Sequence, residues 1–222
     1  MVKSQQSAQV GPVTDIVIAG GGLVGASLGL AAAQGGLTVA LIDQGNPAGY
    51  LDTAFDGRSS AIAYSSRRMF GAMNVWEDML PDAGEIRDIR ITDGASPFYL
   101  HYDHREVGDE PLGWIVENQA IRRALYRATT DHPRIRWHHG ETVTSWESGP
   151  AEVTVALGNG DRLTAALLVA ADGRRSRLRS LAGIRTSNWS YDQTGIVCTA
   201  VHELPHDNIA HERFLPAGPF AI

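Results

Sequence analysis

The sequence predicts an α/β protein whose main domain has three layers, a parallel sheet between helices, and carries an inserted β-rich part. Three observations predict it. An apolar run, 16–19, passes through a glycine-rich turn into an alanine-rich helical segment and a second apolar run, 39–42. A later strand, 162–171, ends in a continuous apolar run, as strands of a buried parallel sheet do. The segments between these runs alternate and predict hairpins of a second part.

The first turn has the glycine spacing of a dinucleotide-binding site. Gly20, Gly22 and Gly25 form a Gly-x-Gly-x-x-Gly motif, and we count Leu23 and Val24 between them with the cofactor-binding residues. The first glycine permits the tight turn, the second lets a pyrophosphate approach the backbone, and the third lets the helix pack on the strand. The helix N-terminus offers free N–H groups and a partial positive charge to the phosphates.

An acidic residue follows at the expected distance. Asp43 closes the second apolar run, 18 residues after Gly25. A carboxylate there accepts hydrogen bonds from both adenosine ribose hydroxyls and repels a 2′-phosphate, which favours FAD or NAD over NADP. The alternatives are an ordinary strand-to-helix turn and a membrane span over 16–33, against which five glycines and the lack of flanking positive charge argue.

Composition excludes several other chemistries. The chain of 222 residues is 43% hydrophobic and 20% charged, as in an ordinary globular protein, and its net charge of −6 provides no basic field for nucleic acid. The only lysine is Lys3, against 18 arginines. The folded part therefore lacks the lysine that a P-loop, a Schiff-base enzyme or a pyridoxal enzyme requires.

The two ends and the single cysteine give further expectations. Residues 1–12 lack an apolar core and are expected to form a flexible tail, not a signal peptide. Cys198 cannot form an internal disulfide, which suits the cytoplasm, and its apolar neighbours predict a buried side chain more than a reactive thiol. The chain stops at 218–222 within an apparent strand, which predicts a fragment truncated at its C-terminus.

The elements between the two motifs follow from periodicity and turn residues. An amphipathic stripe of Ile121, Leu125 and Ala128 predicts a helix, and Asn159-Gly160 predicts a hairpin turn. After a loop at 44–57, helices are expected at 65–73, 118–129 and 176–182, and strands at 85–93, 97–104, 112–116, 135–138, 142–146, 152–157, 162–171, 195–202 and 212–222.

A second motif stands at the end of the long buried strand. Asp172-Gly173 follows the apolar run, and Ser176 and Arg179 follow at the start of the next helix. A carboxylate at the carboxyl end of a parallel strand lies beside the ligand in an α/β sheet. The alternative is that Asp172 only caps the helix.

The two motifs together resemble those of the FAD-dependent aromatic-ring monooxygenases, the para-hydroxybenzoate hydroxylase-like class. Segments 55–66, 111–118 and 213–220 resemble its ubiquinone-biosynthesis branch, in particular the group of 2-polyprenyl-6-methoxyphenol hydroxylases. The resemblance runs from about residue 13 to the last residue. It implies a Rossmann-like FAD/NAD(P)-binding domain at 13–84 and 106–186, with parts of a substrate domain at 85–105 and 187–222.

The resemblance also implies roles for individual residues. Asp172 and Gly173 would serve both FAD and NAD(P)H, Arg58 would face the flavin, and Asn118 would reach the FAD. A surface ion pair with Asp56 is the alternative for Arg58, and a helix N-cap is the alternative for Asn118. The later Gly-Asp motif of the family is not found and is expected beyond residue 222.

The activity implied is hydroxylation of a (poly)prenylated phenol, in which NAD(P)H reduces FAD and the reduced flavin activates O₂ as its C4a-hydroperoxide. The resemblance implies a lipophilic substrate, peripheral contact with a membrane or a ubiquinone-biosynthesis complex, and no nucleic acid. No catalytic side chain is assigned, and the scattered histidines do not predict a metal site. An FAD oxidase or dehydrogenase of another small molecule, and a non-catalytic FAD-binding fragment, remain as alternatives.

Overall fold

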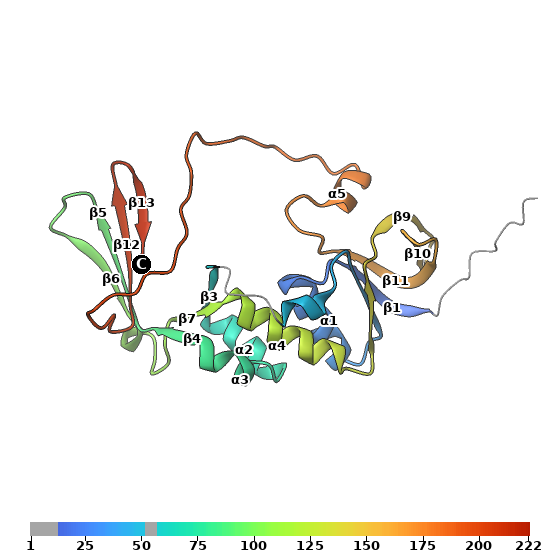
Figure 1. Ribbon diagram of the computed structural model, residues 1–222, viewed down its shortest axis with the longest axis horizontal. Helices are drawn as coiled ribbons and strands as arrows, with labels where there is room; N and C mark the ends of the chain where they lie inside the picture. Colours follow the sequence, from blue (N-terminus) through green and yellow to red (C-terminus); the bar gives the residue numbers. More distant parts are fainter. Residues whose placement is uncertain (1–12, 52–56) are drawn as a thin grey trace, which may run out of the picture. The chain divides into compact units, whose positions relative to one another are not determined.

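The computed structural model describes residues 13–51 and 57–222 (Figure 1). Within them the chain forms two compact units, one of 13–51 and 122–194 and the other of 57–121 and 195–222. The expected tail at 1–12 lies outside the described residues. Because helix α4 (Asn118–Thr130) contains the division between the units, each unit is described by itself.

The first unit is built on a six-stranded sheet in the order β8-β2-β1-β11-β10-β9. β8, β2, β1 and β11 are parallel, whereas β10 and β9 continue the sheet as antiparallel strands. The parallel part and the return of β11 to it confirm the predicted α/β fold. The strands are β1 Thr14–Ala19, β2 Val39–Asp43, β8 Ile135–His139, β9 Val143–Ser148, β10 Val153–Leu157 and β11 Arg162–Ala170.

Both faces of the sheet are buried at β1 and β2, which explains the continuous apolar runs of these two strands. Helix α1 (Leu23–Gln34) covers one face, where Ile18 and Leu41 have no exposed surface (Figure 1). Val17 and Ile42 point to the other face and join a core with the antiparallel strands. The short elements of this unit are α5 (Arg177–Leu181) and the 3₁₀ turn η1 (Pro47–Tyr50).

The described part of the second unit contains an antiparallel sheet, a mixed sheet and the helices α2 and α3. One sheet has the order β3-β7-β4 and the other β13-β12-β5-β6. The elements are β3 Ser59–Ala63, α2 Tyr64–Ala72, α3 Trp76–Met79, η2 Leu80–Asp82, β4 Ala83–Ile86, β5 Asp88–Asp93, β6 Tyr99–Asp103, η3 His104–Glu106, β7 Gly113–Glu117, β12 Ile209–Leu215 and β13 Gly218–Ala221.

Three strand predictions in this unit are wrong, two of them in part and one as a whole. The strand expected at 85–93 is two strands of different sheets, because the chain leaves β4 at Arg87, whose N–H donates to the carbonyl of Asn208. The strand expected at 212–222 is the β12–β13 hairpin, which turns at 216–217. The segment 195–202 has no strand, and its apolar side chains, such as Val201, are exposed.

Three burial predictions are also wrong. Leu167 of β11 is 52% exposed, because 166–170 pairs with β1 on one side while the pairing with β10 ends at Ala165. The helix expected at 176–182 directs Leu178 and Leu181 inward, but Leu181 is half exposed, since the short helix α5 buries only Leu178. Cys198 is exposed. The assignment of FAD-binding and substrate domains to residue ranges remains a prediction, because the compact units group the chain by contacts and not by ligand.

Candidate nucleotide-binding site

The turn between β1 and α1 has room for glycine alone at its first position. Gly20 has φ +104°, a conformation that side chains other than glycine rarely adopt. A Cβ added there would lie 2.2 Å from the carbonyl oxygen of Ala171, and the Gly20 N–H donates to the carbonyl of Ile42 over 2.7 Å. The turn is therefore fixed against the ends of β2 and β11.

The next glycines differ in what surrounds them. A Cβ on Gly25 would lie 1.8 Å from the carbonyl oxygen of Gly20, so α1 packs directly on the turn. Around Gly22, the N-cap of α1, a Cβ would meet nothing within 4 Å. Leu23 is half-buried and Val24 exposed on the first turn of the helix. The backbone at Gly22 is thus open to a ligand while the helix behind it is fixed.

The carboxylate of Asp43 ties the turn to the end of β2. Its Oδ2 accepts from the N–H of Gly21 over 2.6 Å, and its Oδ1 accepts from the N–H of Gly45 over 2.8 Å. A carboxylate has about four lone-pair directions, so both oxygens can accept further hydrogen bonds. Asp43 is therefore held in place beside the glycine turn and can still bind ribose hydroxyls.

A small hollow lies behind the turn, and the sequence analysis did not find its walls. It is about 10 Å³, room for about one water molecule, so a larger group would lie against its outside. Arg122 and Tyr126 of α4 and Trp137 of β8 line it together with Gly21 and Gly22. The position of Arg122, one helical turn into an amphipathic helix, was a signal that could have been read. The placement of Trp137 depends on strand pairing.

Asp172 reaches the same edge of the sheet from β11. The Ala171 N–H donates to the carbonyl of Ala19, and a Cβ on Gly20 would lie 2.9 Å from the Asp172 nitrogen. The two sequence motifs, far apart in the chain, therefore meet. Gly173 follows with φ +84° and open space around it.

One oxygen of Asp172 has a partner and the other does not. Oδ2 accepts from the Leu178 N–H over 3.1 Å, whereas Oδ1 is buried and has no hydrogen-bond partner in the described part of the chain. Burial raises the pKa of Asp172, but the Ser176 hydroxyl and nearby backbone N–H groups outweigh it, so the pKa lies below its usual range. Ser176 caps α5 by accepting from the Arg179 N–H. Capping thus accounts for one oxygen of Asp172 and leaves Oδ1 for another donor.

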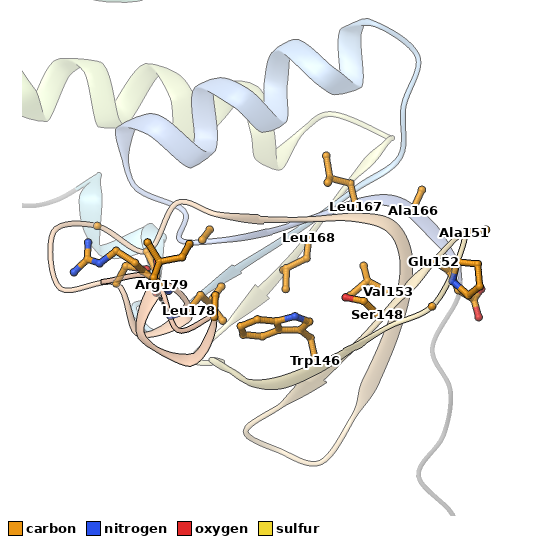
Figure 2. Close-up of a pocket in the computed structure, with 18 residues that line it drawn as sticks. Trp146, Ser148, Ala151, Glu152, Val153, Ala166, Leu167, Leu168, Leu178 and Arg179 are labelled. Carbon is orange, nitrogen blue, oxygen red and sulfur yellow. Dashed lines mark hydrogen bonds between the residues drawn. The ribbon is translucent and has the colours of Figure 1, made fainter. Parts of the chain in front are cut away.

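A larger hollow of about 620 Å³ lies beside Asp172, along the edge of β11 that β10 leaves open. Figure 2 shows Leu168 and Leu178 directed toward the Trp146 ring on its apolar side. Arg179 also lines the hollow, and its guanidinium donates to the carbonyl of Arg174. Three neighbouring arginines, Arg174, Arg175 and Arg177, are exposed.

The remaining two predicted site residues lie in the second unit and contact each other. The Asn118 N–H donates to the carbonyl of Arg58 over 3.0 Å, and the Asn118 Oδ1 accepts from the Ser60 hydroxyl over 2.6 Å. The Asn118 side chain thus binds β3 in addition to starting α4. The alternative partner of Arg58, Asp56, lies outside the described residues. In the residues the structure describes, no three metal-ligating side chains gather, and no helix is long and apolar enough to cross a membrane.

The fold and this edge define a class of protein, and comparison with known sequences agrees. The chain matches the family described as FAD binding domain over residues 13–215 and belongs to it. Two features fit this cofactor. The open backbone at Gly22 leaves room for a phosphate, and the unpartnered oxygen of Asp172 can accept a hydrogen bond from a hydroxyl group.

Particular relatives are ubiquinone hydroxylases. Ubiquinone hydroxylase UbiL of Rhodospirillum rubrum is 40% identical over 210 residues, which are 95% of this chain and 49% of that protein. Ubiquinone biosynthesis monooxygenase COQ6 of Xenopus tropicalis is 31% identical over 97% of this chain and 50% of its own length. The chain thus spans about half the length of the curated relatives it matches. The resemblance to the ubiquinone-biosynthesis branch is confirmed.

Solved structures confirm the fold. A mutant of PqsL from P. aeruginosa aligns with a TM-score of 0.69 and 17% identity, over 81% of this chain and 48% of that one. The flavin-dependent monooxygenase PieE, solved with FAD and substrate, aligns with a TM-score of 0.64 and 18% identity, over 80% of this chain and 33% of that one.

Proposed function

We propose that this protein acts as an FAD-dependent monooxygenase that hydroxylates a (poly)prenylated phenol ring in ubiquinone biosynthesis, with NAD(P)H and O₂ as co-substrates. The observation that carries the proposal is the meeting of Gly20 and Asp172 at one sheet edge, in a chain whose relatives are ubiquinone hydroxylases. A shared edge allows both motifs to contact one extended cofactor.

The first unit would hold the ADP half of FAD. The backbone at Gly22 and the N–H groups of the first turn of α1 would contact the pyrophosphate, where the partial positive charge of the helix favours the anion. Leu23 and Val24 lie in that turn, and Arg122 adds a positive charge beside it. Asp43 would accept from the ribose hydroxyls, and Asp172 Oδ1 and the backbone of Gly173 would contact FAD or NAD(P)H.

Arg58 and Asn118 would contact the flavin half, by the resemblance of their segments to the family. Their mutual backbone hydrogen bond and the bond from Ser60 fix the start of α4, which supports a positioning role. When bound, FAD supplies hydride acceptance, O₂ activation and oxygen transfer, and the protein orients the ring and excludes water. We assign no described side chain to the chemical step.

The substrate class sets the expected surroundings. A prenylated phenol partitions into membranes, so we propose that the protein works in the cytoplasm with peripheral contact to a membrane or to other enzymes of ubiquinone biosynthesis. The names of the relatives support the phenolic substrate.

Product analysis tests the reaction class. The protein is incubated with FAD, NAD(P)H and a prenylated phenol under ¹⁸O₂, and the product is analysed by mass spectrometry. We expect one ¹⁸O atom in a new ring hydroxyl. Oxidation of the phenol without oxygen incorporation would instead support an FAD oxidase or dehydrogenase.

A further inference from the structure

Two aromatic rings stand side by side at the end of β8, next to Asp43. β8 pairs in parallel with β2, and in this register Leu41 lies opposite Trp137 and Asp43 opposite His139. The Trp137 and His139 rings stack with their centroids 5.3 Å apart and their planes at 25°. Their side chains therefore share the sheet face that carries the Asp43 carboxylate.

The inner ring of this stack is fixed on several sides. A Cβ on Gly21 would lie 2.3 Å from the Trp137 ring, so the indole packs directly on the glycine turn. Tyr126 of α4 meets the same ring edge-on, with centroids 6.1 Å apart. The Glu141 N–H donates to the Asp43 carbonyl, which fastens the end of β8 to β2. Trp137 is thus a rigid support.

The outer ring is available to a ligand. His139 is exposed, and its imidazole makes no hydrogen bond or ion pair within the described part of the chain, so the stack on Trp137 is what orients it. This differs from the neighbouring His138, whose Nε2 is buried on the other face of the sheet. His139 therefore presents one flat face to Trp137 and one to solvent.

The order of the strands indicates which part of a nucleotide would reach this ring. Neighbouring strands lie about 4.8 Å apart. With the pyrophosphate at the end of β1 and the ribose at Asp43 on β2, the next group in the same direction lies at the end of β8. In an adenosine nucleotide that group is the base, which is attached to the ribose.

We propose that His139, held flat by Trp137, is the surface on which the adenine of FAD stacks. This inference rests on the proposed function, since it assumes the nucleotide lies along this edge. Stacking of a base on an aromatic ring requires a rigid, solvent-facing π surface beside the ribose site, and His139 provides one within the register of Asp43. The stack therefore adds affinity for the base, while Asp43 recognises the sugar.

The test is a titration of the full chain with ADP and, separately, with ribose 5-phosphate. Binding is monitored by NMR at ligand concentrations up to the millimolar range. We expect His139→Ala to weaken ADP binding about 5- to 30-fold. We expect His139→Phe to restore it, because the ring is kept. Neither substitution should change the binding of ribose 5-phosphate, which has no base.

Asp43→Ala separates failure of the inference from failure of the proposed site. If Asp43→Ala abolishes ADP binding and His139→Ala leaves it unchanged, the nucleotide site stands and the stacking role is overturned. Equal losses for ADP and ribose 5-phosphate in His139→Ala would overturn it too, since the residue would then act through the fold. Absence of ADP binding to the unsubstituted chain would overturn both.

Discussion

Gly22 and Gly25 belong to one motif but serve different needs, and substitution separates them. Gly22 has φ −68° and open space, so Gly22→Ala should fold normally and change stability by no more than about 0.5 kcal/mol. A methyl group there would hold the pyrophosphate away from the backbone, and we expect FAD affinity to fall about tenfold, or about 1.4 kcal/mol. FAD titration and thermal unfolding measure the two effects.

Gly25→Ala is the matched contrast. Its Cβ would overlap the carbonyl oxygen of Gly20, so we expect a loss of stability of about 1–3 kcal/mol, whether or not FAD is present. Equal stability of the two variants in urea unfolding would contradict this account of the turn.

His138 gives the first unit a dependence on pH. Burial is the main cause that lowers its pKa below the ordinary value of about 6.5, and Arg136 adds to it. As the pH falls, the unfolded chain therefore binds a proton at this histidine before the folded chain does. The contribution of neutral His138 to the free energy of unfolding is complete above about pH 6.5, and it is lost as the pH falls from there toward the pKa of the folded state.

His138→Gln should remove that part of the pH dependence. We expect the fall in melting temperature between pH 7.5 and 5.5 to be smaller in the variant than in the unsubstituted protein. His132→Gln, at a partly exposed histidine outside the strand, is the control. The same fall in all three proteins would show that His138 is not the titrating group.

At the scale of elements, packing around Arg67 of α2 holds the helices of the second unit to β7. Its guanidinium lies 5.7 Å from the centre of the Trp76 ring and 6.0 Å from that of Trp114, and the two rings meet edge-to-face at 5.3 Å. Arg67→Ala should cost about 1–2 kcal/mol, through the lost cation–π contacts and the lost cover over the rings. Urea unfolding measures it.

The neighbouring Arg68 is the control for that prediction. Arg68 is exposed on the same helix, so Arg68→Ala removes the same charge without the ring contacts. If Arg68→Ala lowers the free energy of unfolding as much as Arg67→Ala does, the lost charge, and not the lost ring contacts, explains the effect.

Most elements could be predicted because their periodicity follows which side chains are buried. The alternation in β10 and the stripe of Ile121 and Leu125 on α4 match buried positions. The burial prediction failed at Leu167. The apolar run there predicts a strand buried on both faces, but β10 does not pair with this part of β11, and Leu167 is exposed. The pattern also failed at 85–93, because alternation continues through Arg87 and does not report a change of sheet.

For the whole molecule, the positions of Gly20, Asp43 and Asp172 could be predicted because parallel strands end at a common edge. Trp137 and His139 could not, since they reach that edge through β8, whose pairing with β2 has no short-range signal. The chain carries both motifs of the family at one edge, and the proposed function depends on that assembly.

The most direct test of this account is an FAD titration of the protein, followed by the change in the flavin absorbance spectrum, with Asp43→Ala and Asp15→Ala compared. Both carboxylates accept backbone N–H groups, Asp15 from Thr38 at the opposite end of β1 and Asp43 from Gly21 and Gly45. We expect FAD to bind the unsubstituted protein and Asp15→Ala with similar affinity, and Asp43→Ala to lose at least about tenfold. Equal affinity of all three proteins for FAD, or no binding by any of them, would contradict the assignment of this edge to the cofactor.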